Sequence, residues 1–227
     1  MKILINPGHG MKSNGTYDPG AVGTYLREAD INQSIGRFLT GMLIGNGIEA
    51  EMFQSGDLSA VTEKANKGGY DYFISLHCNA SSDFKASGVE TLIPASGGKA
   101  DIIASSVQAE LVRVLGLRDR GVKLRPELYV LRNTTMPSIL IEVAFISNPT
   151  EEKRLGDEEF QFHAALAIHN GFIDAVNYKP VVNREMLKKM IQDRVQFSYP
   201  YAVWELLDKH PNPDEVYRKL LDAMEKM

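Results

Sequence analysis

Four side chains of this chain are of types that bind metal ions or transfer protons, and they stand at positions that suit both roles. His9, His77 and Glu142 each follow an apolar run typical of a buried strand, and Glu28 stands just before a helix-like segment. Sites in α/β sheets form at the carboxyl ends of strands. Two imidazoles and one carboxylate are the protein ligands of a common open zinc site, whose fourth position takes a water. The sequence therefore predicts a zinc site at one edge of a sheet.

Each of these residues also has a purely structural interpretation. A histidine at a strand end is often a buried residue with satisfied hydrogen bonds. Glu28 could simply be a first-turn acid that interacts favourably with the helix dipole. Glu142 is the hardest to explain in this way, because it adjoins a buried strand and an unpaired buried carboxylate is costly. We therefore expect Glu142 to lie near a metal ion or a basic group, or to take part in catalysis.

The remaining histidines and the single cysteine fit a reactive site less well. Cys78 directly follows His77, and adjacent side chains of a strand point to opposite faces. We therefore expect its thiol to face away from the site and not to act as a nucleophile. His163 and His169 stand on different faces of a helix-like segment, which favours structural or surface roles, and His210 is expected to be solvated.

These residues need a scaffold in which strands alternate with helices. The expected strands are Lys2–Asn6, Ile48–Phe53, Tyr70–His77, Val89–Pro94, Leu128–Leu131 and Ser138–Phe145. The expected helices are one capped by Asp30, then Leu58–Lys67, Ala100–Leu115 and Glu158–Val176. This order predicts an α/β fold with a largely parallel central sheet flanked by helices.

The sequence changes character near Pro180, beyond which the apolar residues recur only at helical spacing. We therefore divide the chain into a catalytic domain at residues 1–179 and a small all-helical appendage at residues 180–227. Three short helices cannot easily form an independent core. We expect them to dock on the first domain or to form a homodimer.

Charge and hydropathy exclude two kinds of partner. The net charge is -4 and the sequence pI is about 5.8, whereas binding nucleic acid needs a basic face. No run approaches the about 18 apolar residues of a membrane-spanning helix. The first residues also lack the features of a signal peptide, so we expect synthesis in the cytoplasm.

Several motifs follow one another along the chain, namely INPGHG at 5–10, DPGAVG at 18–23, SLHCNA at 75–80, SGVETL at 87–92, RGVK at 120–123 and SILIEVAF at 138–145. Together with Glu28 they resemble the zinc-dependent N-acetylmuramoyl-L-alanine amidases of the type-3 cell-wall amidase family. The resemblance implies that His9, Glu28 and His77 bind zinc and that Glu142 is the catalytic glutamate. It implies that the substrate is peptidoglycan and that zinc-activated water cleaves the amide between N-acetylmuramic acid and L-alanine.

Two positions depart from the family pattern, and two others are candidates for substrate binding. Asn6 stands where the family often has Asp, which predicts the loss of a charge beside His9, and Cys78 stands where it often has Ala. Asn79 and Asn148 could hydrogen-bond the substrate, although turn formation is the commoner use of Asn.

Two other functions remain open. A zinc peptidase or another amidohydrolase would use the same ligands on a different amide, and a wall-binding module would have no activity. The presence of all four site residues argues against the second. A lytic enzyme without an export signal suits a phage or prophage endolysin that acts on the cell wall after release, or else a mother-cell autolysin. Residues 180–227 would then bind the wall, dimerise or dock.

Overall fold

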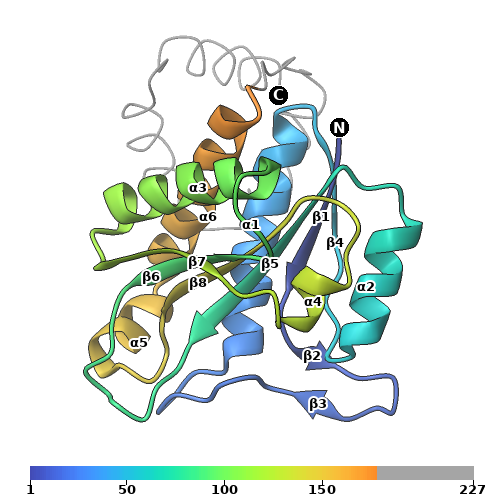
Figure 1. Cartoon of the computed structure of the whole chain (residues 1–227). Helices are drawn as coiled ribbons and strands as arrows, with labels where there is room; N and C mark the ends of the chain where they lie inside the picture. Colours follow the sequence, from blue (N-terminus) through green and yellow to red (C-terminus); the bar gives the residue numbers. More distant parts are fainter. Residues whose placement is uncertain (178–227) are drawn as a thin grey trace, which may run out of the picture.

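The computed structural model describes residues 1–177, in which a six-stranded sheet carries helices on both faces (Figure 1). The strands of this sheet are β1 (Lys2–Pro7), β4 (Glu49–Met52), β5 (Tyr72–Asn79), β6 (Val89–Ile93), β7 (Asp119–Leu124) and β8 (Ser138–Phe145). Two very short strands, β2 (Gly10–Met11) and β3 (Tyr17–Asp18), form a separate antiparallel pair.

The strand order in the sheet is β4-β1-β5-β8-β6-β7. Strands β4, β1, β5 and β8 run parallel, whereas β6 is antiparallel to β8 and parallel to β7. The predicted α/β fold with a largely parallel sheet is confirmed. The structure also shows that β6 and β7 run opposite to the other four strands, which the sequence did not indicate. Because of this reversal, the beginning of β6 adjoins the end of β8.

The helices divide unequally between the two faces of the sheet. One face carries α1 (Glu28–Gly45), α3 (Lys99–Leu115), α5 (Pro149–Leu155) and α6 (Glu158–Ala175). Among residues 1–177, the other carries α2 (Leu58–Lys67) and α4 (Tyr129–Arg132). Successive side chains of β1 point to opposite faces of the sheet. Ile3 and Ile5 therefore pack in the larger core, and Leu4 packs in the smaller one.

Two sequence-based expectations about these elements are wrong. The apolar run expected as a strand at Leu128–Leu131 contributes instead to helix α4, which buries Val130 and Leu131; a run this short does not distinguish a strand from a helical turn. Asp30 is not the cap of α1, which begins at Glu28 after Arg27. The backbone N–H groups of Glu28 and Ala29 bond to loop carbonyls, so no side-chain cap is needed.

The expected appendage at 180–227, any homodimer formed through it, and His210 lie outside the described residues. Within residues 1–177, no helix combines the length and the apolar character needed to span a membrane.

Candidate metal centre and active site

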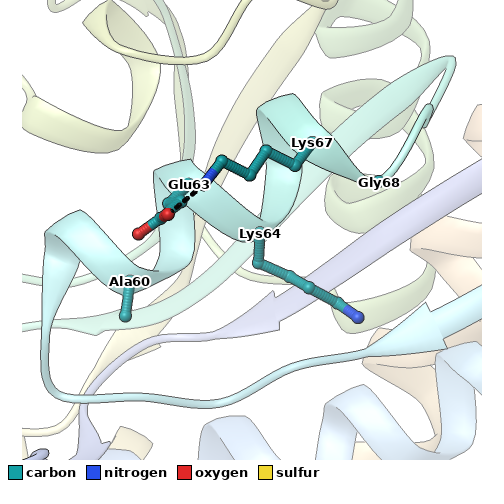
Figure 2. A pocket seen from close by; sticks show the side chains of 5 residues that line it. All are labelled: Ala60, Glu63, Lys64, Lys67 and Gly68. Atoms are coloured by element: carbon teal, nitrogen blue, oxygen red, sulfur yellow. Dashed lines mark hydrogen bonds and ion pairs between the residues drawn. The ribbon is translucent and has the colours of Figure 1, made fainter.

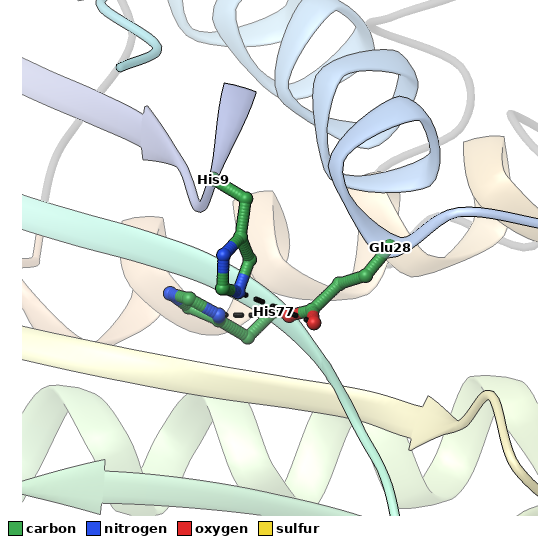
Figure 3. A group of neighbouring side chains, drawn as sticks. All are labelled: His9, Glu28 and His77. Atoms are coloured by element: carbon green, nitrogen blue, oxygen red, sulfur yellow. Dashed lines mark hydrogen bonds and ion pairs between the residues drawn. The ribbon is translucent and has the colours of Figure 1, made fainter. Parts of the chain in front are cut away.

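Three residues that are far apart in the sequence meet at the carboxyl edge of the sheet (Figure 3). His9 follows β1, Glu28 is the first residue of α1 and His77 lies near the end of β5. One possible ligand atom from each lies within 4.8 Å of the others. Glu28 Oε1 is 2.8 Å from His77 Nδ1, and Glu28 Oε2 is 3.2 Å from His9 Nε2. The single carboxylate thus connects both imidazoles.

Glycines give these side chains the room to converge. A Cβ on Gly8 would lie 2.2 Å from His77 Cε1, and a Cβ on Gly20 would lie 2.5 Å from His9 Cδ2 and 2.6 Å from Glu28 Oε2. His9 itself has a φ of 65°, a conformation that costs free energy in a residue with a side chain and is concentrated at functional sites. The glycines around His9 therefore make space for the site.

The Glu28 carboxylate is buried and held in place by the backbone. Its Oε2 accepts a hydrogen bond from the N–H of Ala21 at 2.8 Å, and its Oε1 accepts one from the N–H of Cys78 at 3.0 Å. Burial opposes ionisation, but His77 and His9 outweigh it and hold the pKa of Glu28 well below its usual value. Glu28 is therefore a fixed negative charge that faces two imidazoles.

Asp18 contacts the other nitrogen of His9. Its Oδ2 lies 3.2 Å from His9 Nδ1, which leaves Nε2 directed at Glu28. Burial lowers the pKa of His9, but the carboxylates of Glu28 and Asp18 outweigh it and raise this pKa to about 9. A partner carboxylate on the far nitrogen is the usual way in which a metal-binding histidine is oriented. Sequence reasoning did not assign this role to Asp18, although the residue lies in the DPGAVG motif.

The Asn6 side chain bonds to the two neighbouring segments of the chain. Its Nδ2 donates to the carbonyl of Phe53, and its Oδ1 accepts from the hydroxyl of Ser75. The carboxylate that contacts His9 Nδ1 comes from Asp18, and the effect of an asparagine at position 6 on His9 stays a prediction.

Glu142 lies beside His77 on the same face of the sheet, because the two residues are register partners in β8 and β5. Its Oε2 atom is buried and has no hydrogen-bond partner among residues 1–177. Burial raises the pKa of Glu142 to about 7. A carboxyl group with this pKa exchanges protons near neutrality, which is the property of a general acid or base.

The two asparagine candidates differ in their surroundings. Asn148 is the N-cap of α5: its side chain accepts from the N–H groups of Thr150 and Glu151, and its Nδ2 donates to the carbonyl of Ala86. These contacts give Asn148 a structural role. Asn79 lies on the same strand face as His77, and its Nδ2 donates to Glu90 Oε1 at 2.9 Å.

Two of the remaining candidates from the sequence, Cys78 and His169, are buried. Cys78 packs in the larger core, on the face opposite His77, and burial raises the pKa of its thiol well above the usual value. The expectation that it faces away from the site is confirmed. His169 connects α6 to α1 through Asn46, whose Nδ2 lies 2.7 Å from His169 Nε2.

The hollows on the surface of residues 1–177 include two shallow ones. The first lies on α2 (Figure 2), where Lys67 pairs with Glu63 and Lys64 pairs with Glu51. The charged side chains that line this hollow are all in ion pairs, and none of the lining residues belongs to the candidate metal centre. The second, of about 430 Å³, adjoins His9 and is lined by Gly10, Met11, Tyr17, Arg27, Asp30, Gln33 and Gln54.

The donor set at the sheet edge fits a divalent cation. Donor atoms bound to one zinc at about 2.0–2.2 Å lie roughly 3.3–3.6 Å apart in a tetrahedron, compared with 3.2 Å from Glu28 Oε2 to His9 Nε2 and 2.8 Å from Glu28 Oε1 to His77 Nδ1. The buried, unpaired oxygen of Glu142 lies next to this set. This arrangement is compatible with a metal-dependent hydrolase, in which an open coordination position and a carboxyl group for proton transfer lie side by side.

Comparisons with known proteins agree with this class. Residues 3–174 match the family model described as N-acetylmuramoyl-L-alanine amidase. The amidase LytC of Bacillus subtilis is 34% identical over 177 residues, which cover 75% of this chain and 34% of LytC. The sporulation-specific N-acetylmuramoyl-L-alanine amidase of B. subtilis is 30% identical over 198 residues, which cover 84% of this chain and 74% of the relative.

A solved structure of N-acetylmuramoyl-L-alanine amidase from Clostridium difficile 630 superposes with a TM-score of 0.71 at 29% identity. The match covers 78% of this chain and 97% of the other. The chain therefore belongs to the type-3 cell-wall amidase family, whose members are peptidoglycan amidases.

Proposed function

We propose that this enzyme uses a zinc ion held by His9, Glu28 and His77 to hydrolyse the amide between N-acetylmuramic acid and L-alanine in peptidoglycan. The observation that carries the proposal is the convergence of two imidazoles and a buried carboxylate beside the unpaired oxygen of Glu142. When bound there, zinc would act as a Lewis acid that activates water and stabilises negative charge on the carbonyl oxygen.

Glu142 moves the proton in this proposal. As general base it accepts a proton from the attacking water, and as general acid it passes that proton to the departing alanine nitrogen. The carbon–nitrogen bond breaks, so the products are a lactoyl carboxylic acid and a free L-alanine amine. A pKa of about 7 suits a carboxyl group that serves in both directions.

Digestion of purified cell walls tests the bond that is cleaved. We expect new L-alanine amino termini, no new reducing ends, and loss of the reaction in a chelator that zinc then reverses. Mass spectrometry of the fragments distinguishes this amidase from a zinc peptidase or another amidohydrolase. Walls that bind the protein but release nothing, together with a metal-free protein, would favour a non-catalytic module.

The variant Glu142→Gln tests the proton-transfer role. It should bind zinc normally and lose about 10²–10⁴-fold in turnover, the usual contribution of general acid–base catalysis. Glu110→Gln, which removes an ion pair with Arg113 on the surface of α3, is the matched control. Turnover of Glu142→Gln within tenfold of the control would contradict the assignment.

For the biological setting, we propose a lytic enzyme of either a phage or a sporulating cell. The resemblance to a sporulation-specific amidase supports the second setting, and the endolysin role stays a prediction. Measuring the transcript during prophage induction and during sporulation separates the two, because each setting predicts a rise in one condition only.

A further inference from the structure

Three carboxylate or imidazole side chains form a row across neighbouring strands. His77 of β5 pairs in register with Glu142 of β8, and Glu142 pairs in register with Glu90 of β6. All three therefore lie on one face of the sheet. Glu90 belongs to the SGVETL motif and is only 4% exposed. The proposed reaction assigns no role to it.

Glu90 is an ionised residue with partners for both of its oxygens. Its Oε2 accepts from Arg120 Nε at 2.6 Å and also pairs with Lys123 Nζ, both on β7. Its Oε1 accepts from Asn79 Nδ2 at 2.9 Å. Burial opposes the charge, but the two cations outweigh it and lower the pKa of Glu90.

The ionised state of Glu90 decides which way the Asn79 carboxamide points. A carboxylate only accepts hydrogen bonds, so the group of Asn79 that faces it must be the NH₂. The carbonyl oxygen is then directed elsewhere, and within residues 1–177 the structure gives Asn79 Oδ1 no donor. Asn79 lies two residues after His77, on the same strand face. Asn79 therefore offers an unused acceptor on the strand face that also carries His77.

We propose that Glu90 is a positioning residue that fixes Asn79 as a hydrogen-bond acceptor for an amide N–H of the bound substrate. The proposal rests on the proposed amidase function, whose substrate carries peptide N–H groups on the alanine side of the cleaved bond. Arg120 and Lys123 contribute by keeping Glu90 charged. The site thus favours a substrate that places a peptide N–H against Asn79 Oδ1. It disfavours a substrate that places a hydrogen-bond acceptor there.

Exchanging the carboxylate of Glu90 and the carboxamide of Asn79 tests the orientation of the Asn79 side chain. In Glu90→Gln, the new amide oxygen should turn toward Arg120 and its NH₂ toward Asn79, which then rotates and presents NH₂ to the substrate. In Asn79→Asp, two carboxylates would face each other. We expect each single variant to lose roughly tenfold to a hundredfold in kcat/KM with unchanged bound zinc.

The double variant Glu90→Gln/Asn79→Asp should recover to within about threefold of wild type. The introduced glutamine can donate to one oxygen of the introduced aspartate, while the other oxygen of that aspartate accepts from the substrate. If Asn79 instead donates to the substrate, the double variant stays as impaired as Asn79→Asp, and the proposal is wrong. Glu110→Gln again serves as the control for the removal of an ion-paired glutamate.

Nuclear magnetic resonance of the wild-type chain without substrate tests the contact directly. A correlation across the hydrogen bond between Asn79 Nδ2 and the Glu90 carboxylate is expected, with one side-chain proton shifted downfield. Its absence would overturn the proposal even if the variants failed to fold. A wild-type protein that shows this correlation but releases no L-alanine amine would contradict the amidase function and, with it, the substrate role of Asn79, while the Glu90 contact itself would stand.

Discussion

Substituting Gly8 with alanine is expected to weaken zinc binding at least about a hundredfold while leaving the fold intact. The added Cβ would lie 2.2 Å from His77 Cε1 and 2.4 Å from Nε2. An ordinary contact begins at about 3.4 Å, so the imidazole would have to move by about 1.2 Å, the difference between these distances. Metal–ligand distances tolerate only about 0.2 Å. The required displacement is thus several times larger than the tolerance.

The backbone cannot easily relieve this clash. The N–H of Gly8 donates to the carbonyl of Leu76 at 2.8 Å, which holds the end of β1 against β5. Changes that only reorient a ligand already cost about 10–100-fold in metal affinity. Displacing His77 itself should cost at least about a hundredfold, or about 2.7 kcal/mol. Competition with a chromophoric chelator measures this affinity.

Gly41→Ala is the matched control, because a Cβ at this helical position meets no atom within 4 Å. It should bind zinc like the wild type and unfold at slightly higher denaturant concentration, since alanine favours a helix interior by up to about 1 kcal/mol over glycine. Gly8→Ala should unfold cooperatively in the metal-free state. A Gly8→Ala protein with wild-type zinc affinity would refute the placement of His77 in the metal centre.

Three further predictions concern the residues around the site. Asp18→Asn should weaken zinc binding by about 10–100-fold, because His9 loses the carboxylate on its Nδ1; an unchanged chelator titration would mean that Asp18 does not orient it. Asn148→Ala should lower the free energy of unfolding by about 1 kcal/mol, the usual cost of a lost N-cap, with wall digestion unchanged; impaired digestion at full zinc occupancy would instead favour a substrate contact. The lowered pKa of Glu90 means that its stabilisation is present above the ordinary glutamate pKa of about 4.3 and disappears as the pH falls through the lower folded value. Denaturant unfolding should therefore show the largest gap between wild type and Glu90→Gln at neutral pH and a shrinking gap below about pH 4; a gap independent of pH would contradict the ionised state.

Much of the site could be predicted because its signals are local. The apolar runs before His9, His77 and Glu142 identify strand ends, and strand ends on one edge of a parallel sheet converge whatever the length of the connections. Alternation along a strand placed Cys78 on the opposite face from His77, and the structure confirms it. Cap assignment failed at Asp30, because the first N–H groups of α1 bond to a loop whose path the sequence does not reveal.

The sequence by itself determined the kinds of side chain available, the alternation of strands and helices, and the strand ends at which the chemistry stands. Only the tertiary structure decided which groups meet. Asp18 reaches His9 through a short hairpin, Gly8 leaves room for His77, and the reversal of β6 brings Glu90 next to Glu142. These contacts join residues separated by many positions, and side-chain periodicity, which reports only on neighbours along one element, carries no information about pairing between elements.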